Sequence, residues 1–171
     1  MVQETMSARE QILGKIEPLA ESKHPGAFQG ASKEFDFRAS LAVVGARVMT
    51  MAELETEFPG RRRYDKTLDG LSLAGIEVLE IDGDFGVAEN GAIWLEDINL
   101  GLRALPFITE HLVIVLDRQK LVETMHQGYD LIGDAKSGFG LFIAGPSKTA
   151  DIEQSLVIGA HGAKSLRVVL V

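Results

Sequence analysis

Apolar residues follow one another without interruption at two places in the second half of the chain. Residues 112–116 read Leu-Val-Ile-Val-Leu, and residues 168–171 read Val-Val-Leu-Val. Strands that are buried on both faces of a parallel sheet have this pattern, because neither face of the strand meets water. Together with shorter apolar runs, these segments predict strands over residues 76–81, 92–96, 112–116, 140–144 and 166–171.

Apolar residues at helical spacing separate these strands. Residues 118–132 and 149–159 are predicted helices, and they alternate with the last three predicted strands. Further upstream, the pattern predicts helices over 34–44 and 52–58 and a short strand over 47–51. A strand-helix-strand order favours right-handed parallel crossovers. The sequence therefore predicts an α/β fold with a mostly parallel sheet and flanking helices.

The first part of the chain differs from the rest. Ser7 and Glu10 have the spacing of a capping box, and an apolar stripe follows, which predicts a helix over 7–21. A stretch with proline and glycines comes next and is typical of a flexible connection. We therefore expect residues 1–32 to form an N-terminal helix with its connection, and residues 33–171 to form the α/β domain. The helix is expected to pack against its own domain or against a partner, which leaves a homo-oligomer open.

Composition narrows the functions that the chain can have. It has 171 residues, a formal net charge of −8 and no cysteine. Without cysteine it cannot form a disulfide, a zinc–thiolate site or a cysteine-ligated Fe–S cluster. The negative charge disfavours a nucleic-acid surface, which needs clustered lysine and arginine. The polar N-terminus lacks the apolar core of a signal peptide, and no apolar run approaches the roughly 20 residues of a membrane helix. We therefore expect a soluble, cytoplasmic protein that binds neither nucleic acid nor a membrane.

Residues 145–153 read Gly-Pro-Ser-Lys-Thr-Ala-Asp-Ile-Glu and combine a turn with a predicted helix start. With Ser147 or Thr149 as the N-cap, the first N–H groups of this helix lack partners and favour an anion. Lys148 would lie in the first turn, where the helix dipole disfavours a cation. Its charge is therefore offset either by a nearby carboxylate or by a bound anion. The candidate ligand-binding residues of this segment are Gly145, Ser147, Lys148, Thr149 and Asp151.

Two acidic residues and a histidine in or after this segment are further candidates for a functional role. Asp151 and Glu153 lie about 200° apart on a helical wheel, so they cannot act as a catalytic pair in one small site. His161 follows in a Gly-Ala-His-Gly loop before the last predicted strand, where it either binds a ligand or faces solvent. The sequence has no His-Glu-x-x-His motif and no histidine–carboxylate cluster, so we expect no metal site.

The segment 82–91 is a second candidate. It carries three glycines between two predicted strands, which bends the backbone sharply. Glu89 and Asn90 lie just before the strand 92–96, and a carboxylate at such a place can serve as nucleophile or general base, with Asn90 as a candidate ligand-binding residue. The alternative is a β-hairpin, because Asn90-Gly91 favours a type I′ turn. A hairpin and a functional role are compatible with each other.

Arg61, Arg62 and Arg63 form a basic run after Pro59-Gly60. We expect this run in a solvated loop. The alternative is that it docks an acidic partner or ligand.

The two candidate segments together resemble the LUD domain, the domain of the lactate-utilisation protein C family. Gly-Pro-Ser-Lys-Thr-Ala-Asp-Ile-Glu with the downstream Gly-Ala-His-Gly is similar to the signature of that family. Residues 84–91, Asp-Phe-Gly-Val-Ala-Glu-Asn-Gly, resemble its other recurring motif, and so does Leu105-Pro106 before the strand that starts at His111. The resemblance extends from about residue 75 to the C-terminus, and the region before it is compressed relative to the family.

This resemblance implies a fold and a function. The fold is the NagB/RpiA/CoA-transferase-like fold, which is related to sugar-phosphate isomerases and CoA transferases. The function is an accessory role in the oxidation of L-lactate to pyruvate, beside partner proteins that carry Fe–S clusters. No cofactor is then expected in this chain itself, and a small carboxylate or phosphate is the expected ligand of residues 145–149.

A second resemblance concerns Glu89-Asn90-Gly91, which is similar to the Glu-Asn-Gly motif of family I CoA transferases, whose glutamate attacks a thioester. It implies an acyl or CoA transferase with Glu89 as the catalytic nucleophile, beside backbone donors that hold the oxyanion. A third interpretation is an assembly module without catalysis. The sequence leaves open whether the chain is an enzyme.

Overall fold

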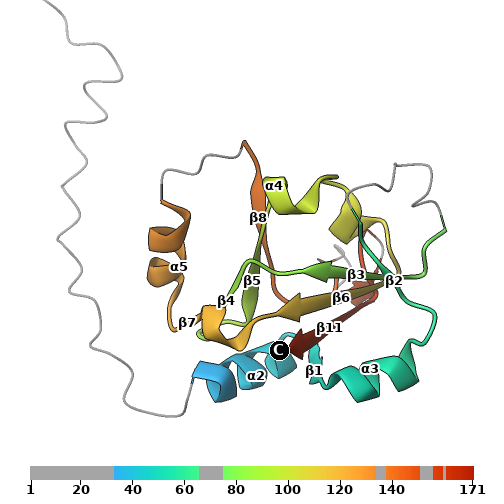
Figure 1. The fold of residues 1–171 in the computed structure, drawn as a ribbon, viewed down its shortest axis with the longest axis horizontal. Coiled ribbons are helices and arrows are strands. Elements are labelled where there is room, and N and C mark those ends of the chain that lie inside the picture. The colour runs from blue at the N-terminus through green and yellow to red at the C-terminus, as the bar shows by residue number, and fades with distance from the viewer. Residues whose placement is uncertain (1–32, 66–74, 134–137, 151–155, 160) are drawn as a thin grey trace, which may run out of the picture.

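Five parallel strands form the central sheet (Figure 1). The structure is a computed structural model, and it describes residues 33–65, 75–133, 138–150, 156–159 and 161–171. The strands follow the order β1, β11, β6, β3, β2, and every neighbouring pair is parallel. Their bounds are β1 (Arg47–Met49), β2 (Arg62–Arg63), β3 (Val78–Asp82), β6 (His111–Leu116) and β11 (Ser165–Leu170).

The two uninterrupted apolar runs of the sequence lie side by side within this sheet. β6 and β11 pair along their whole lengths, from His111 opposite Ser165 to Leu116 opposite Leu170. Val113 of β6 is fully buried, as expected of a strand that is covered on both faces. The predicted α/β fold with a mostly parallel sheet and flanking helices is confirmed.

A second sheet of four strands packs against one face of the central sheet. Its strands, in spatial order, are β7 (Leu121–Val122), β4 (Phe85–Val87), β5 (Ala92–Glu96) and β8 (Gly140–Ile143). β5 is antiparallel to both β4 and β8. The predicted strand over 140–144 is therefore present, but the prediction that it continues a series of parallel crossovers was wrong.

The helix predicted over 118–132 is divided into three elements. A 3-10 turn, η2 (Arg118–Lys120), is followed by β7, and α5 (Met125–Ile132) begins only after Thr124. The Thr124 side chain accepts a hydrogen bond from the backbone of the third helical residue, which reciprocates in a capping box. Leu121 and Val122 stay outside the helix because they pair with β4 as strand β7.

The prediction of a helix over residues 149–159 was wrong. Residues Lys148–Ala150 form β9, residues Leu156–Ile158 form β10, and the two strands pair antiparallel. Residues 151–155 between them lie outside the described residues. Two of the three residues of β10 are β-branched, and such residues favour strands over helices.

The predictions for the N-terminal half of the domain were closer. α2 (Lys33–Val43) and α3 (Met51–Glu57) correspond to the helices predicted over 34–44 and 52–58, with β1 between them. Two short elements, α4 (Asp97–Leu100) and η1 (Leu105–Phe107), follow β5. The helix and connection predicted for residues 1–32 lie outside the described residues, so the domain boundary stays a prediction. None of the described helices has the length and the apolar character needed to cross a membrane.

The basic run at residues 61–63 is not a solvated loop. Arg62 and Arg63 form β2, which pairs in parallel with Leu79 and Glu80 of β3 at the edge of the central sheet. The expectation of a free loop was therefore wrong, because the run is joined to the sheet by backbone pairing.

Three apolar clusters hold the layers together. The largest lies between the two sheets, where Ile114 of β6 and Ile93 of β5 are buried with Leu41 of α2. A second cluster covers the opposite face of the central sheet and includes Leu54 of α3. The third lies between the second sheet and α5, which Figure 1 shows beside that sheet. The core is thus layered, with α3 on one side and α5 on the other.

Gly83 is the point at which the chain passes from the central sheet to the second sheet. It lies between β3 and β4, and a Cβ atom there would be 2.9 Å from Cγ2 of Ile93 and 3.0 Å from Cγ2 of Ile114. Real Cβ atoms do not approach other atoms so closely, so only glycine fits without a shift of the core. This close approach fixes the backbone between Asp82 and Asp84.

Candidate functional site

A pocket of about 280 Å³ collects most of the residues predicted to bind a ligand in the second half of the chain. Gly145, Ser147, Lys148 and His161 all line it. Leu112 and Leu166, near the starts of β6 and β11, form part of its apolar wall. We call it the signature pocket, and its complete lining is Pro106, Phe107, Leu112, Phe142, Ile143, Ala144, Gly145, Pro146, Ser147, Lys148, His161, Gly162, Ala163 and Leu166.

The wall at Gly145 has its shape because the chain turns there with a positive φ. Gly145 has a φ of +83°, and a Cβ atom would lie 2.5 Å from the carbonyl oxygen of Val44. Both the left-handed backbone and the close approach require glycine. The turn that follows β8 is thereby pressed against the turn that joins α2 to β1.

Two backbone hydrogen bonds attach the loop after Gly145 to the loop that carries His161. The N–H of Ser147 donates to the carbonyl of Ala163 at 2.9 Å, and the N–H of Gly159 donates to the carbonyl of Ser147 at 3.0 Å. A Cβ atom at Gly162 would lie only 3.1 Å from Cβ of Ser147. The recurring glycines of the signature therefore let two loops lie against each other around the pocket.

Lys148 provides a cation at the pocket, but it does so from a strand. It is the first residue of β9, it is exposed, and its Nζ donates to the carbonyl oxygen of Val44 at 2.5 Å. Thr149 pairs with Val157 of β10. The prediction that a helix starts at Ser147 or Thr149 was therefore wrong, because residues 148–150 form a strand. Asp151 and Glu153 lie outside the described residues, so the helical-wheel argument about them stays a prediction.

The chemistry available in the signature pocket is that of a binding site. Lys148 supplies one positive charge, Ser147 a hydroxyl group, and His161 an exposed imidazole whose ring nitrogens can donate or accept a hydrogen bond. None of the described residues that line the pocket carries a carboxylate. The described residues also contain no group of three histidine, aspartate or glutamate side chains that could hold a metal ion. These groups suit the hydrogen bonds that a small anion accepts.

Glu89 and Asn90 lie in a different part of the molecule. β4 and β5 form an antiparallel hairpin whose loop consists of residues 88–91, so the hairpin interpretation is confirmed with a four-residue loop in place of a two-residue turn. The Asn90 side chain accepts from the N–H of Ala92 at 3.0 Å, which stabilises this loop. Neither residue lines the signature pocket.

The carboxylate of Glu89 has a structural partner. Its Oε2 accepts a hydrogen bond of 2.9 Å from the N–H of Met125, the first residue of α5. A carboxylate at this place satisfies a backbone donor that the helix leaves without an internal partner. Glu89 is exposed, and its role as a catalytic nucleophile stays a prediction.

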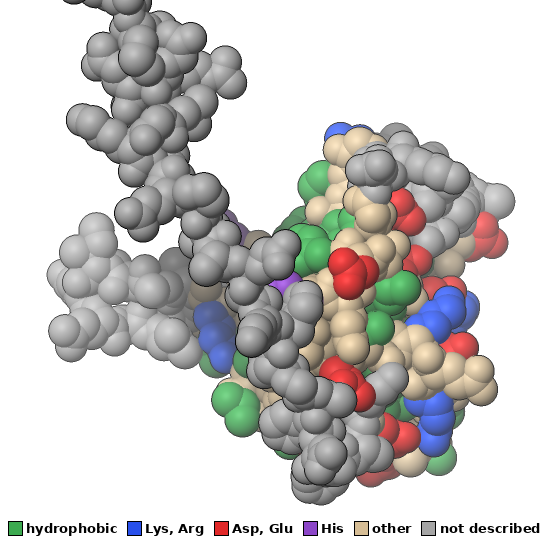
Figure 2. Space-filling model, turned by 90° about the vertical axis from the view of Figure 1, so that its left-hand side faces the viewer, with side chains coloured by type: hydrophobic (Ala, Val, Ile, Leu, Met, Phe, Trp, Pro, Cys, Tyr) green, Lys and Arg blue, Asp and Glu red, His purple; other side chains and the backbone are tan. Residues whose placement is uncertain are grey.

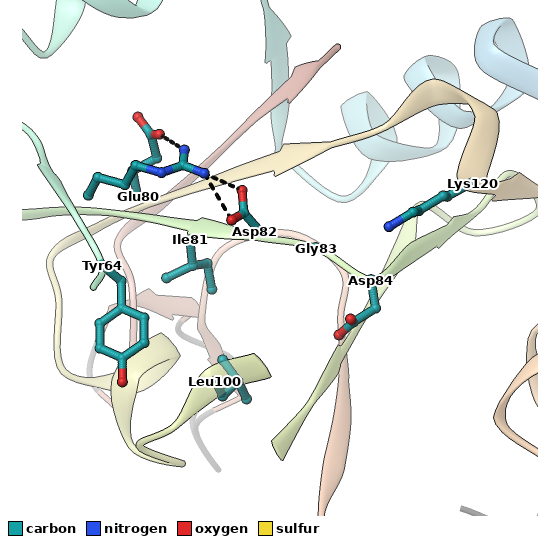
Figure 3. A pocket seen from close by; sticks show the side chains of 9 residues that line it. Tyr64, Glu80, Ile81, Asp82, Gly83, Asp84, Leu100 and Lys120 are labelled. Atoms are coloured by element: carbon teal, nitrogen blue, oxygen red, sulfur yellow. Dashed lines mark hydrogen bonds and ion pairs between the residues drawn. The ribbon is translucent and has the colours of Figure 1, made fainter. Parts of the chain in front are cut away.

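Sequence reasoning missed a second cavity, of about 430 Å³, at the carboxyl end of β3 (Figure 3). Its lining includes Arg63, Tyr64, Glu80, Ile81, Asp82, Gly83, Asp84, Leu100 and Lys120. Glu80 was the available signal: it stands in an otherwise apolar stretch of β3, and a buried carboxylate requires a cationic partner.

That partner is the basic run of residues 61–63. Glu80 is only 3% exposed, and its carboxylate accepts from Nε of Arg61 at 2.6 Å and from Nη1 of Arg63. Hydrogen bonds that Arg61 donates to Glu55 and Glu80 raise its pKa, and the bonds of Arg63 to Glu80 and Asp82 raise the pKa of Arg63. The arginines therefore neutralise acidic side chains of their own domain.

Charged side chains elsewhere are scattered. Figure 2 shows acidic and basic side chains distributed over one face of the molecule, with no continuous basic surface among the residues drawn in colour. This distribution agrees with the formal net charge of −8.

Curated relatives of similar sequence match about half of the chain. The lactate utilization protein C of Bacillus pumilus (strain SAFR-032) is 34% identical over 85 residues, which are 46% of this chain and 35% of that protein. The protein of the same name from Deinococcus radiodurans is 32% identical over 88 residues, 50% of this chain and 42% of that protein. The matched part thus spans less than half of the length of these curated relatives.

A solved structure extends the comparison to the fold. The crystal structure of a DUF162 family protein from Deinococcus radiodurans, determined at 1.70 Å resolution, aligns with a TM-score of 0.60 over 82% of this chain and 99% of that chain. The sequence identity is 16%, so this likeness concerns the fold alone.

The family assignment rests on the sequence from the end of β3 onward. Residues 81–171, slightly more than half of the chain, match the profile of the LUD domain. This region contains the two motifs that resemble the family, and it supplies all the residues that line the signature pocket. The chain belongs to the LUD domain family.

Proposed function

We propose that this chain is an accessory component of a lactate-utilisation system, and that its signature pocket binds a small carboxylate or phosphate. Relatives that are named lactate utilization protein C support the first part. In the proposed system, partner proteins carry the Fe–S clusters that oxidise L-lactate to pyruvate, because a chain without cysteine cannot ligate them through thiolates. We propose the cytoplasm as the compartment.

The observation that carries the ligand proposal is the convergence of Gly145, Ser147, Lys148 and His161 on one pocket. Gly145 and Ser147 lie on one loop, Lys148 begins β9 directly after it, and His161 lies on a second loop. Backbone hydrogen bonds hold the two loops together. An anion would replace the carbonyl of Val44 as the partner of the Lys148 ammonium. A charge-assisted bond is stronger than a bond to a neutral carbonyl, so the exchange favours the anion.

The expected affinity is low. Lys148 is exposed, and a single exposed cation with a few neutral donors is expected to hold a small anion with a Kd of about 1 mM, which corresponds to about −4 kcal/mol. Binding of this strength suits a metabolite that is present at millimolar concentration.

The experiment is an NMR titration of the ¹⁵N-labelled chain with L-lactate, pyruvate and inorganic phosphate. Binding is monitored through the amide signals of Ser147, Lys148 and Gly162. We expect saturable shifts in the millimolar range and their loss in Lys148→Met. Lys120→Met serves as the matched control, because it removes an exposed lysine that does not line the signature pocket. An absence of saturable shifts with all three ligands would contradict the anion site.

The partnership needs a separate experiment. We expect the chain to co-purify with Fe–S proteins from cells grown on lactate. If this association survives both Lys148→Met and Glu89→Gln, the chain acts as an assembly module and the pocket is not needed for docking. If no Fe–S protein is captured, the accessory role is contradicted.

A further inference from the structure

The cavity at the carboxyl end of β3 lies where parallel α/β sheets bind small molecules. β3 ends at Asp82, and the neighbouring strand β6 ends at Leu116. The cavity is lined by residues that follow both strands, among them Asp84 after β3 and Lys120 after β6. Crevices outside the carboxyl ends of parallel strands are the usual ligand sites in such folds. The volume of about 430 Å³ lies within the ordinary range for small-molecule pockets.

Most charges around this cavity are already balanced by one another. Glu80 is bound by Arg61 and Arg63, and the Nη2 of Arg63 also donates to both carboxylate oxygens of Asp82, at 2.7 and 2.9 Å. Lys120 differs from these residues, because its ammonium forms no ion pair or hydrogen bond with the described residues. It is the cation of this cavity that is available to a ligand.

Asp84 provides an acceptor near this cation, in a fixed position. One of its carboxylate oxygens accepts from the N–H of Glu96 at 2.7 Å, and its own N–H donates to the carbonyl of Trp94 at 3.0 Å. The tight packing of Gly83 holds the backbone just before it. In Figure 3 Lys120 and Asp84 lie on the same side of the cavity. The carboxylate of Asp82 is instead engaged by Arg63. An exposed cation and a carboxylate that is held in position thus line one small space.

We propose that this cavity binds a small carboxylate that carries a hydrogen-bond donor on the neighbouring carbon, that is, a 2-hydroxy acid or a 2-amino acid. Lys120 binds the ligand's carboxylate, and Asp84 accepts a hydrogen bond from the hydroxyl or ammonium group. The apolar side chains of Ile81 and Leu100, which also line the cavity, contact the carbon chain. An anion without a donor would meet only repulsion from Asp84, and a cation without a carboxylate would be repelled by Lys120. The site therefore selects a ligand that carries both a carboxylate and a hydrogen-bond donor. This inference does not rest on the function proposed for the signature pocket.

The test compares four ligands of similar size: L-lactate, L-alanine, propionate and pyruvate. The last two lack a donor next to the carboxylate. In titrations of the ¹⁵N-labelled chain, we expect the amides of Gly83, Asp84 and Leu121 to shift with lactate or alanine at concentrations at least tenfold lower than with propionate, because a hydrogen bond to a charged acceptor contributes about a tenfold difference. The better of the two donors identifies the ligand as a hydroxy acid or an amino acid.

Two variants assign the roles. Lys120→Met is expected to weaken binding about tenfold or more. Asp84→Asn is expected to reduce the preference for lactate or alanine over propionate. Lys164→Met is the matched control, because this exposed lysine lines neither cavity, and it is expected to leave these shifts unchanged. Because Asp84→Asn also alters a bond to Glu96, the comparison of ligands in the unaltered chain decides the question if this variant fails to fold.

The outcomes separate this inference from the function proposed above. Equal binding of propionate and lactate at Gly83, or shifts that persist in Lys120→Met, would overturn it. Shifts confined to Ser147, Lys148 and Gly162 would support the signature pocket alone and would also overturn it. Shifts at Gly83 that survive Lys148→Met support it even where the signature pocket binds nothing.

Discussion

The buried carboxylate of Glu80 offers the sharpest test of how the edge of the central sheet is held. We consider its replacement by alanine and by glutamine. Glu80 is 3% exposed and is bound by Arg61 at 2.6 Å and by Arg63. The side chain of Arg61 is itself only 14% exposed, so removal of the carboxylate leaves a cation with little access to water.

The expected loss of stability follows from what each arginine retains. Breaking a buried ion pair costs about 3–5 kcal/mol, because the remaining charge is left without compensation. Arg61 keeps Glu55 at 2.5 Å, and Arg63 keeps Asp82 at 2.7 Å, so we expect the lower end of that range. We predict that Glu80→Ala lowers the free energy of unfolding by about 3 kcal/mol. Glu80→Gln keeps one oxygen acceptor, and its loss is expected to be about 1–2 kcal/mol.

The assay is urea unfolding followed by circular dichroism. With an m-value of about 2 kcal/mol/M, Glu80→Ala is expected to lower the urea midpoint by about 1.5 M without a change in m. The loss is expected to persist in about 1 M salt, because buried pairs are screened little. Glu110→Gln removes the exposed partner of the exposed Lys164 and is the control. A loss for Glu80→Ala no larger than that of this control would refute the argument that the basic run neutralises a buried charge.

Three further predictions concern other parts of the fold. Gly145→Ala is expected to lower the thermal midpoint and to destabilise the domain by more than about 1 kcal/mol, because φ is +83° and the carbonyl oxygen of Val44 blocks the new Cβ atom. Gly60→Ala is the control and is expected to change the midpoint little, because nothing lies within 4 Å of its Cβ position. Gly140→Ala is expected to displace the ring of Trp94, the single tryptophan of the chain, and to shift its fluorescence to longer wavelength; Gly138→Ala, whose nearest neighbour is 3.9 Å away, is expected to leave the emission unchanged. The pKa of Glu53 is lowered below its ordinary 4.5 by hydrogen bonds from the N–H and the hydroxyl of Thr50, so its contribution to stability is complete above that pH and is lost as the pH falls through the lower folded-state value. Glu53→Gln is therefore expected to show a shallower fall of the urea midpoint between about pH 5 and pH 3 than the unaltered chain, and equal slopes would contradict the capping role.

Elements whose character is set along the chain itself were predictable. The runs that became β6 and β11 are apolar throughout, so their place in the buried part of a parallel sheet followed from the sequence. The stretch 149–159 was mistaken because a short apolar run fits a helix and a strand equally well. In the structure Leu156–Ile158 pairs antiparallel with Lys148–Ala150, so both segments are strands. In the same way, the pairing of β7 with β4 shortened a predicted helix.

The candidate sites show the same limit. Gly145, Ser147, Lys148 and His161 were expected to act together because they stand in one signature, and they line one pocket. The second cavity joins Arg63, Asp84 and Lys120, which are far apart in the sequence. Only the register of the strands brings them together, and no local pattern encodes that register. Their proximity could therefore not be predicted from the chain alone.

The two edge strands of the central sheet affect whether copies of the chain associate through their sheets at high concentration. Sheet edges carry unpaired backbone groups and are the usual starting points of aggregation. Here the marginal strands are β1, with three residues, and β2, with two. Exposed arginines stand on both, Arg47 on β1 and Arg62 and Arg63 on β2. Strands this short and this charged offer a poor template for another chain, so any homo-oligomer is expected to form through side-chain surfaces and not by continuation of the sheet from one copy into the next.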